Sequence, residues 1–210
     1  MVGVYPVRAG RSTGYRGAVQ RILVYGVTGS GKSTLARRVA ARLQLPYHSI
    51  DDLTWEPDWT PVPDEVQRDR VRAVCAGQAW VIDSAYAKWL DLALARTDLI
   101  VGLDLPRRVS LTRLVRRTVA RIVQRTSICN GNAETWRGAL FSRDSLVVFH
   151  FRSFARKRRR MRAWQADPDF PETVLLRSPA DVRRWFAALP GPAGLPASSR
   201  AGRAAGADRA

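Results

Sequence analysis

The stretch that most constrains the fold is residues 21–35, RILVYGVTGSGKSTL. Its apolar run ILVY is typical of a buried parallel strand. The next eight residues, 26–33, satisfy the pattern G-x-x-x-x-G-K-[ST] at every fixed position. Beyond them Leu35, Val39 and Leu43 recur every four residues, which predicts a helix. A strand, a glycine-rich turn and a helix in this order indicate a phosphate-binding loop.

The residue types in this loop are those that phosphate binding requires. Glycines let the backbone bend so that its N–H groups converge on phosphate oxygens, and the helix N-terminus adds partial positive charge there. Lys32 is placed to reach the β- and γ-phosphates of ATP, and Ser33 to offer its hydroxyl to Mg²⁺. We therefore expect ATP and Mg²⁺ as cofactors. The expected nucleotide-binding set in the loop is Gly26, Thr28, Gly29, Ser30, Gly31, Lys32, Ser33 and Thr34.

The rest of the chain alternates short apolar runs with helical patterns. The expected strands beyond the first are 47–50, 79–82, 99–103 and 174–176. The expected helices beyond the first are 64–76, 110–125, 141–164 and 180–189. A Trp- and Pro-rich ordered loop is expected over 53–63. This alternation implies a three-layer α/β domain with a parallel five-stranded sheet and helices on both faces.

Composition indicates one domain with loose ends. Of 210 residues, we expect 19–189 to form the domain, 1–18 a flexible N-terminal extension and 190–210 a disordered C-terminal tail. No apolar run approaches a membrane span and no signal peptide is evident, so we expect a cytoplasmic protein without a membrane partner. The two cysteines, Cys75 and Cys129, lack metal-type spacing, and no disulfide is expected.

Positive charge is concentrated in one segment. The chain carries +17, and residues 107–162 hold 16 Arg and Lys against two acidic residues, a balance of +14. Nucleic acid, a membrane surface and a polyphosphate substrate all suit such a segment. Within it Arg113, Arg117, Arg121 and Arg125 form an i, i+4 ladder whose like charges repel unless an anion lies among them. We expect the first two to bind an anionic ligand and the last two to face solvent.

Carboxylates follow three of the expected strands. Asp51, Asp83 and Asp104 lie at the C-terminal ends of strands, where ligands bind in parallel sheets. Asp83 is the best candidate to hold Mg²⁺ through water beside Ser33. Either Asp51 or Asp52 could orient a phosphoryl acceptor or act as a base, and a plain helix-cap or turn role fits them equally well.

Several segments together resemble a known family. They are GVTGSGKSTLARRVAARLQLPYHSIDDLTW, WVIDSAY, LDLPRRVSLTRLVRR, NGN, FSRDS and LRSPADVRRWF. In this order and spacing they are similar to adenylate-kinase-related P-loop proteins of the topology-modulation type, over about residues 20–189. The resemblance implies a nucleoside-monophosphate-kinase-like fold with an acceptor-binding insertion after the second strand. It also implies a mobile, basic helical lid at about 107–165.

The resemblance implies roles for individual residues as well. Asp83 matches the Mg²⁺-associated aspartate after the third strand, and Arg113 and Arg117 match two lid arginines that contact ATP phosphates. Arg177 and Pro179 match the loop beside the adenine. Adenylate kinases carry Asp-Gly-Phe-Pro-Arg where this chain reads DSAYAK from Asp83 onward, so their AMP-reading residues cannot be carried over.

Two hypotheses of different classes follow. In the first, the protein is a phosphotransferase in which Mg·ATP donates its γ-phosphoryl group to a nucleotide or small hydroxylated acceptor. Its catalytic set would be Lys32, Asp51, Asp83, Arg113 and Arg117. In the second, residues 152–162 bind nucleic acid non-specifically, and the protein is a regulatory ATPase. A zeta-toxin-like sugar-nucleotide kinase is a third alternative. We favour the phosphotransferase.

Overall fold

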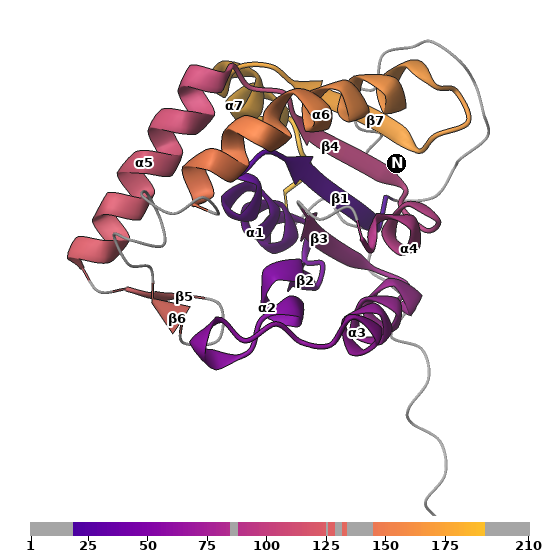
Figure 1. The fold of residues 1–210 in the computed structure, drawn as a ribbon. Coiled ribbons are helices and arrows are strands. Elements are labelled where there is room, and N and C mark those ends of the chain that lie inside the picture. Colours follow the sequence, from indigo (N-terminus) through magenta and orange to yellow (C-terminus); the bar gives the residue numbers. More distant parts are fainter. Residues whose placement is uncertain (1–18, 85–87, 125, 129–131, 134–144, 192–210) are drawn as a thin grey trace, which may run out of the picture.

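A computed structural model gives the fold and describes residues 19–84, 88–124, 126–128, 132–133 and 145–191. Five parallel strands form the central sheet in the order β2-β3-β1-β4-β7 (Figure 1). They are β1 (Arg21–Gly26), β2 (Tyr47–Ser49), β3 (Trp80–Ser84), β4 (Leu99–Leu103) and β7 (Glu172–Leu176). The parallel five-stranded sheet expected from the sequence is confirmed.

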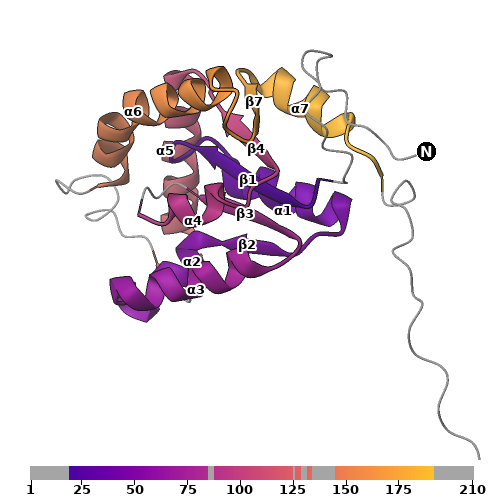
Figure 2. The ribbon, with the colours of Figure 1, turned by 90° about the vertical axis from the view of Figure 1, so that its right-hand side faces the viewer.

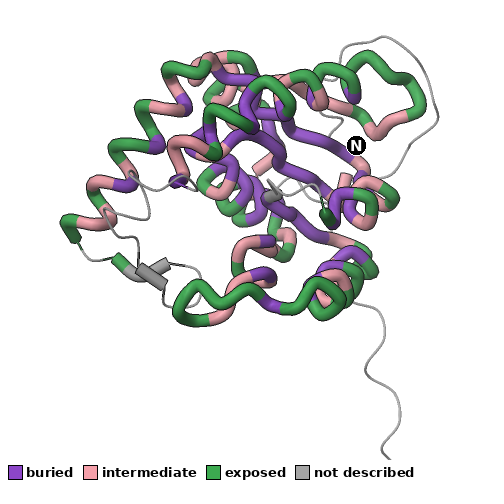
Figure 3. Tube along the Cα trace, in the orientation of Figure 1, coloured by how far each residue is buried: buried purple, intermediate pink, exposed green. Residues whose placement is uncertain are grey.

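Helices cover both faces of this sheet (Figure 2). One face packs on α1 (Lys32–Leu43) and α7 (Pro179–Ala187), the other on α3 (Asp64–Ala76), α4 (Leu90–Leu94) and α6 (Leu146–Ala166). Side chains on a strand alternate, so in β1 Ile22 and Val24 face the first layer while Leu23 and Tyr25 face the second. All four are fully buried, and the sheet is the innermost part of the molecule (Figure 3).

Several short elements were not expected from the sequence. Besides the strands β5 (Ser127–Ile128) and β6 (Asn132–Ala133) described below, they include α2 (Ile50–Thr54), the 3-10 turn η1 (Pro57–Trp59) and α4. The segment 53–63 therefore contains helical turns, and Asp51 and Asp52 lie in the first turn of α2 rather than in a strand-end turn. That placement is favourable, because carboxylates stabilise the positive end of a helix.

A pair of projecting elements follows β4. Helix α5 (Arg107–Val123) leads to a hairpin of β5 (Ser127–Ile128) and β6 (Asn132–Ala133), which stand away from the sheet (Figure 1). Because α5 extends beyond the core, Val115 and Val123 of its expected apolar stripe are exposed. The second half of α6 belongs to the core rather than to a projecting lid, because Met161 and Trp164 pack against the sheet.

Some expectations fall outside the described residues. These are the two terminal segments up to 18 and from 192, Arg125, Cys129 and most of the NGN and FSRDS segments. Cys75 is buried and carries a free thiol. Among the described residues, no helix is long and apolar enough to cross a membrane.

Candidate active site

The phosphate-binding loop joins the end of β1 to the start of α1. Gly29 and Gly31 have φ angles of 80° and 95°, the left-handed region that favours glycine. The Ser30 N–H donates to the Val27 carbonyl at 3.1 Å, which closes the turn. Lys32 is the first residue of α1 and is buried. The unpaired N–H groups of the first helical turn therefore lie at the same loop, where they favour an anion.

Helix α5 packs directly on this loop. A Cβ atom at Gly29 would lie 2.3 Å from the Ser110 carbonyl oxygen and 2.7 Å from the Leu114 Cβ, so only glycine allows the approach. One turn along, the Arg113 guanidinium donates to the Ser30 carbonyl at 3.1 Å. The loop and the arginine ladder of α5 are thus held together.

Asp83 lies beside the loop at the end of β3, in register with Val24 of β1. Its side chain is buried, and the Ser33 hydroxyl donates to its carboxylate. Burial raises the pKa of Asp83, the hydrogen bond from Ser33 and the charge of Lys32 oppose that rise, and the charge of Asp51 adds to it. The sequence-predicted partners Lys32, Ser33, Asp51 and Asp83 therefore form one electrostatic group.

A cleft of about 1050 Å³ opens over the loop. The loop contributes residues 28–34, and Gly26 packs behind it, where a Cβ atom would lie 2.7 Å from the Ser30 Oγ. The basic side chains lining the cleft are Lys32, Arg37, Arg38, Arg113, Arg117, Arg121, Arg152 and Arg183. Arg113 and Arg117, which the sequence predicts to bind an anionic ligand, both line this cleft. Arg121 was expected to face solvent, yet it also lines the cleft, because i, i+4 spacing keeps it on the same face of α5.

The two residues expected beside the adenine are placed differently. Pro179 lines the cleft together with Val182 of α7. The Arg177 side chain instead donates to the Gln165 side chain of α6 at 3.4 Å, and its backbone N–H donates to Asp181 at 3.0 Å. Arg177 thus connects the start of α7 to α6.

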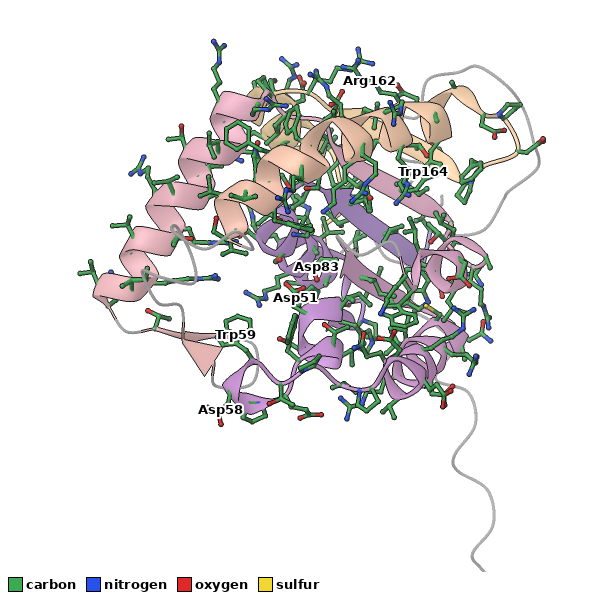
Figure 4. All side chains as sticks on the ribbon, viewed as in Figure 1. Asp51, Asp58, Trp59, Asp83, Arg162 and Trp164 are labelled. Atoms are coloured by element: carbon green, nitrogen blue, oxygen red, sulfur yellow. The ribbon has the colours of Figure 1, made fainter. Side chains whose placement is uncertain are left out.

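The opposite part of the cleft wall comes from β2, α2 and η1. It includes Asp51, Asp52, Trp55 and Trp59. The two indole rings meet edge to face with centroids 5.8 Å apart. Burial raises the pKa of Asp52, and the neighbouring Asp51 charge adds to the rise. Figure 4 shows Asp51 and Asp83 close together, with Trp59 on the same side of the molecule and Asp58 turned outward.

His150 was missed by the sequence reasoning. It is fully buried on α6, and its Nδ1 lies 3.0 Å from the Thr28 carbonyl oxygen of the loop. Since a carbonyl can only accept, Nδ1 carries the proton, while Nε2 lies 3.5 Å from the Ser110 hydroxyl. Burial lowers the pKa of His150, so the neutral ring connects α6, α5 and the loop. A histidine inside the apolar run VVFHF was the available signal.

Lys157 was also missed. Its side chain on α6 is buried, and its Nζ lies 5.0 Å from the centre of the Phe149 ring, which lines the cleft. Burial, together with the positive charge of Lys32, lowers the pKa of Lys157 to about 7. The available signal was composition: Lys157 is the single lysine in a run of arginines, and lysine gives up its proton on burial far more readily than arginine.

The rest of this basic run differs from expectation. Most of 156–160 was expected to face solvent, but only Arg156 and Arg159 are exposed. Arg158 and Arg162 hold the buried Asp104 carboxylate at N–O distances of 2.7 and 3.0 Å. Asp104 thus pairs with two of the basic residues of α6. Figure 4 places Arg162 at the top of the molecule, away from Asp51 and Asp83.

The oxygen donors at the loop fit Mg²⁺. No group of three or more His, Cys, Asp or Glu that could hold a metal occurs in the described part of the chain. Ser33 and Asp83 provide one hydroxyl and one carboxylate, and Mg²⁺ commonly takes such a small set together with waters and substrate phosphates. The pair therefore fits a magnesium ion that arrives with a nucleotide.

Neither a family model nor a curated protein matches the chain. Among solved structures, a shikimate kinase from Bacteroides thetaiotaomicron is similar, with a TM-score of 0.51 and 18% identity over 81% of this chain and 96% of its own. A sugar kinase from Janibacter sp. HTCC2649 has a TM-score of 0.47 and 19% identity over 82% of this chain and 97% of its own. A gluconokinase from Sinorhizobium meliloti 1021 has a TM-score of 0.47 and 19% identity over 80% and 90%. The likeness to the first shows a shared α/β fold, as the sequence predicted.

Proposed function

We propose that the protein is a phosphotransferase that moves the γ-phosphoryl group of Mg·ATP to a small hydroxyl-bearing acceptor. The observation that carries the proposal is the single cleft over the loop. The loop lysine, Ser33, the α5 arginines, Asp51 and two tryptophans line it, and Ser33 hydrogen-bonds the buried Asp83 beside it. The shikimate kinase that shares this fold is described as a kinase, which agrees with this proposal.

The residues have separable roles in this proposal. Lys32 and the loop backbone would bind the phosphates, and Arg113 and Arg117 would neutralise charge on the phosphoryl group during transfer. Ser33 and Asp83 would hold Mg²⁺, the latter through water; the bound ion neutralises charge on the β- and γ-phosphates. On the other side of the cleft, Asp51 would orient the acceptor hydroxyl and accept its proton.

The nucleic-acid alternative gains no support from the part of the chain that the structure describes. In the segment 152–162, Lys157 is buried, and Arg158 and Arg162 are paired with Asp104. An extended row of free cations, which non-specific binding to a phosphate backbone needs, is therefore not what this segment offers. The relation to topology-modulation proteins and the cytoplasmic location stay predictions.

The experiment is a screen for ADP release from ATP by the purified protein. A panel of nucleotides and small metabolites is tested with and without duplex DNA. We expect release that depends on one class of acceptor, and strong slowing by Arg113→Ala and Arg117→Ala. Arg159→Ala is the matched control, because Arg159 is exposed on α6 outside the cleft. Release that depends on DNA and on no acceptor would contradict the proposal.

A further inference from the structure

Lys157 is a buried lysine whose polar contacts are incomplete. Its side chain is 3% exposed, and its Nζ has no hydrogen-bond partner among the described residues. A buried ammonium group loses its water, and the Phe149 ring 5.0 Å from the Lys157 Nζ replaces only part of that loss. Such a group is explained when a ligand supplies the missing partner.

The direction of Lys157 follows from its neighbours on α6. His150, Lys157 and Met161 share the buried face of the helix. His150 contacts the loop carbonyl of Thr28, and Met161 packs on β4, with its Sδ 3.2 Å from where a Cβ of Gly102 would lie. Lys157 lies between these two contacts, so it faces the strand ends at which the loop begins.

The charges around Lys157 indicate a place for an anion. The charged groups that act on it, from the strongest, are Lys32, Arg156, Asp51 and Arg160. Lys32 and Lys157 come from different helices and repel each other at the loop. An anion held between them would turn that repulsion into attraction. At a phosphate-binding loop, the anion that Lys32 reaches is the terminal part of a nucleoside triphosphate.

We propose that Lys157 is a second lysine of the phosphate site, which contacts the γ-phosphoryl group of ATP together with Lys32 and takes up a proton when that group arrives. This inference rests on the proposed function and adds that nucleotide binding is coupled to proton uptake. Burial and the charge of Lys32 lower the pKa of Lys157 to about 7, so most Lys157 side chains are neutral at pH 8 before ATP binds. The phosphoryl anion then favours the ammonium form: one N–H bond forms with a proton from solvent, and no other bond changes.

Calorimetry tests this proposal directly. Mg·ATP is titrated into the full chain at pH 8 without acceptor, in buffers of different ionisation enthalpy, which counts the protons taken up. We expect close to one proton per ATP for the wild type and none for Mg·ADP, which lacks the γ-phosphoryl group. Lys157→Met and Lys157→Arg should both abolish the uptake, because methionine has no proton to gain and arginine stays charged. Lys88→Met is the matched control, since Lys88 is an exposed lysine paired with Asp64, and it should keep the uptake.

A second measurement uses the protein without nucleotide. The lowered pKa means that the unfolded chain binds more protons than the folded one between about pH 7 and the ordinary value of 10.5. Stability therefore rises with pH in this range, and the melting temperature of the wild type should rise from pH 7 to pH 8.5. Lys157→Met should lose that rise. If Lys157→Met does not fold, Lys157→Arg decides the calorimetric test.

The outcomes separate this proposal from the proposed function. Equal proton uptake by the wild type and the Lys157 variants, or no uptake by the wild type, overturns the role of Lys157. Proton uptake with no transfer to any acceptor leaves Lys157 at the phosphate site and overturns the phosphotransferase. Failure of ATP to bind overturns both.

Discussion

Lys32 and Lys88 form a matched pair of lysines for testing the phosphate-binding loop. Lys32 is buried at the loop, whereas Lys88 is exposed and pairs with Asp64. Because Lys32 faces a ligand rather than the apolar core, Lys32→Ala should remain folded and lose at least tenfold in ATP affinity, about 1.4 kcal/mol. Lys88→Ala should bind ATP as the wild type does. Calorimetry with Mg·ATP measures both, and unchanged affinity in Lys32→Ala would refute the loop assignment.

The negative charge of Asp83 is expected to promote turnover and to lower the stability of the fold. Asp83→Asn keeps the shape of the side chain, removes its charge and should slow turnover at least tenfold, about 1.4 kcal/mol of barrier. Burial raises the pKa of Asp83 above its ordinary value of 3.8, so the protonated form stabilises the fold and that contribution is lost as pH rises through the folded-state pKa. At pH 7 without nucleotide, the variant should therefore melt at a higher temperature than the wild type. A lower melting temperature with normal turnover would assign Asp83 a purely structural role.

Site residues that belong to a local sequence pattern could be predicted from the sequence. Site residues whose role depends on their burial in the folded structure could not. Lys32 and Ser33 occupy fixed motif positions, and Asp83 follows an apolar run. His150 and Lys157 depend on which face of α6 lies on the loop, and that face is set by tertiary packing.

At the scale of elements, the close contact between α5 and the phosphate-binding loop makes the protein sensitive to substitution of Gly29. Gly29→Ala would place a Cβ atom 2.3 Å from the Ser110 carbonyl oxygen and strain a φ of 80°. Since backbone must move to admit it, we expect α5 to shift and ATP affinity to fall at least tenfold, with a melting temperature several degrees lower. A matched substitution is Gly191→Ala, where no atom lies within 4 Å of the new Cβ. Thermal melting and ATP titration of both variants check this; equal behaviour would show that the close approach is dispensable.

The turn η1 offers a test of the acceptor side of the cleft. Trp59 is 39% exposed and lines the cleft, and its φ of 53° follows the equally unusual φ of 60° at Asp58. Such left-handed residues cost roughly 1 kcal/mol or more each, so the turn persists only because its surroundings hold it. In steady-state kinetics with the acceptor found by screening, Trp59→Leu should raise the KM for that acceptor severalfold and leave the KM for ATP unchanged. A change confined to ATP would place Trp59 at the nucleotide instead.

The elements themselves were predictable where periodicity extends over many residues. Helices α1 and α5 and the apolar strands show clear repeats, whereas α2 and η1 span five and three residues, too few for a period to be visible. The Trp- and Pro-rich composition of 53–63 indicated order there without specifying its shape.

For the whole molecule, the charge distribution predicts a salt effect that distinguishes the two substrates. The net charge of +17 is concentrated in the segment that contributes α5 and α6 to the cleft. ATP carries several negative charges, so its association rate should fall steeply as salt rises from about 20 to 300 mM, while that of an uncharged acceptor should not. Stopped-flow measurements with a fluorescent ATP analogue test this. An ATP rate independent of salt would mean that the segment does not steer the nucleotide.

The architecture as a whole was predictable in class but not in strand order. A phosphate-binding loop and alternating strands and helices specify a layered parallel sheet. The order β2-β3-β1-β4-β7 depends on crossovers between strands that are not consecutive, such as β4 pairing with β7 about 70 residues later, which no local pattern reports.

The corner formed by Trp55 and Trp59 has an optical consequence. Trp80, Trp89 and Trp164 are buried, and Trp59 is the tryptophan that the described part of the chain leaves exposed. The emission of Trp59, and of Trp55 beside it in the cleft wall, should therefore respond to whatever enters that end of the cleft, whereas the three buried indoles should respond much less. The protein thus carries an intrinsic fluorophore beside its unidentified acceptor, and compounds can be screened by quenching in the absence of ATP, before any turnover assay exists for them.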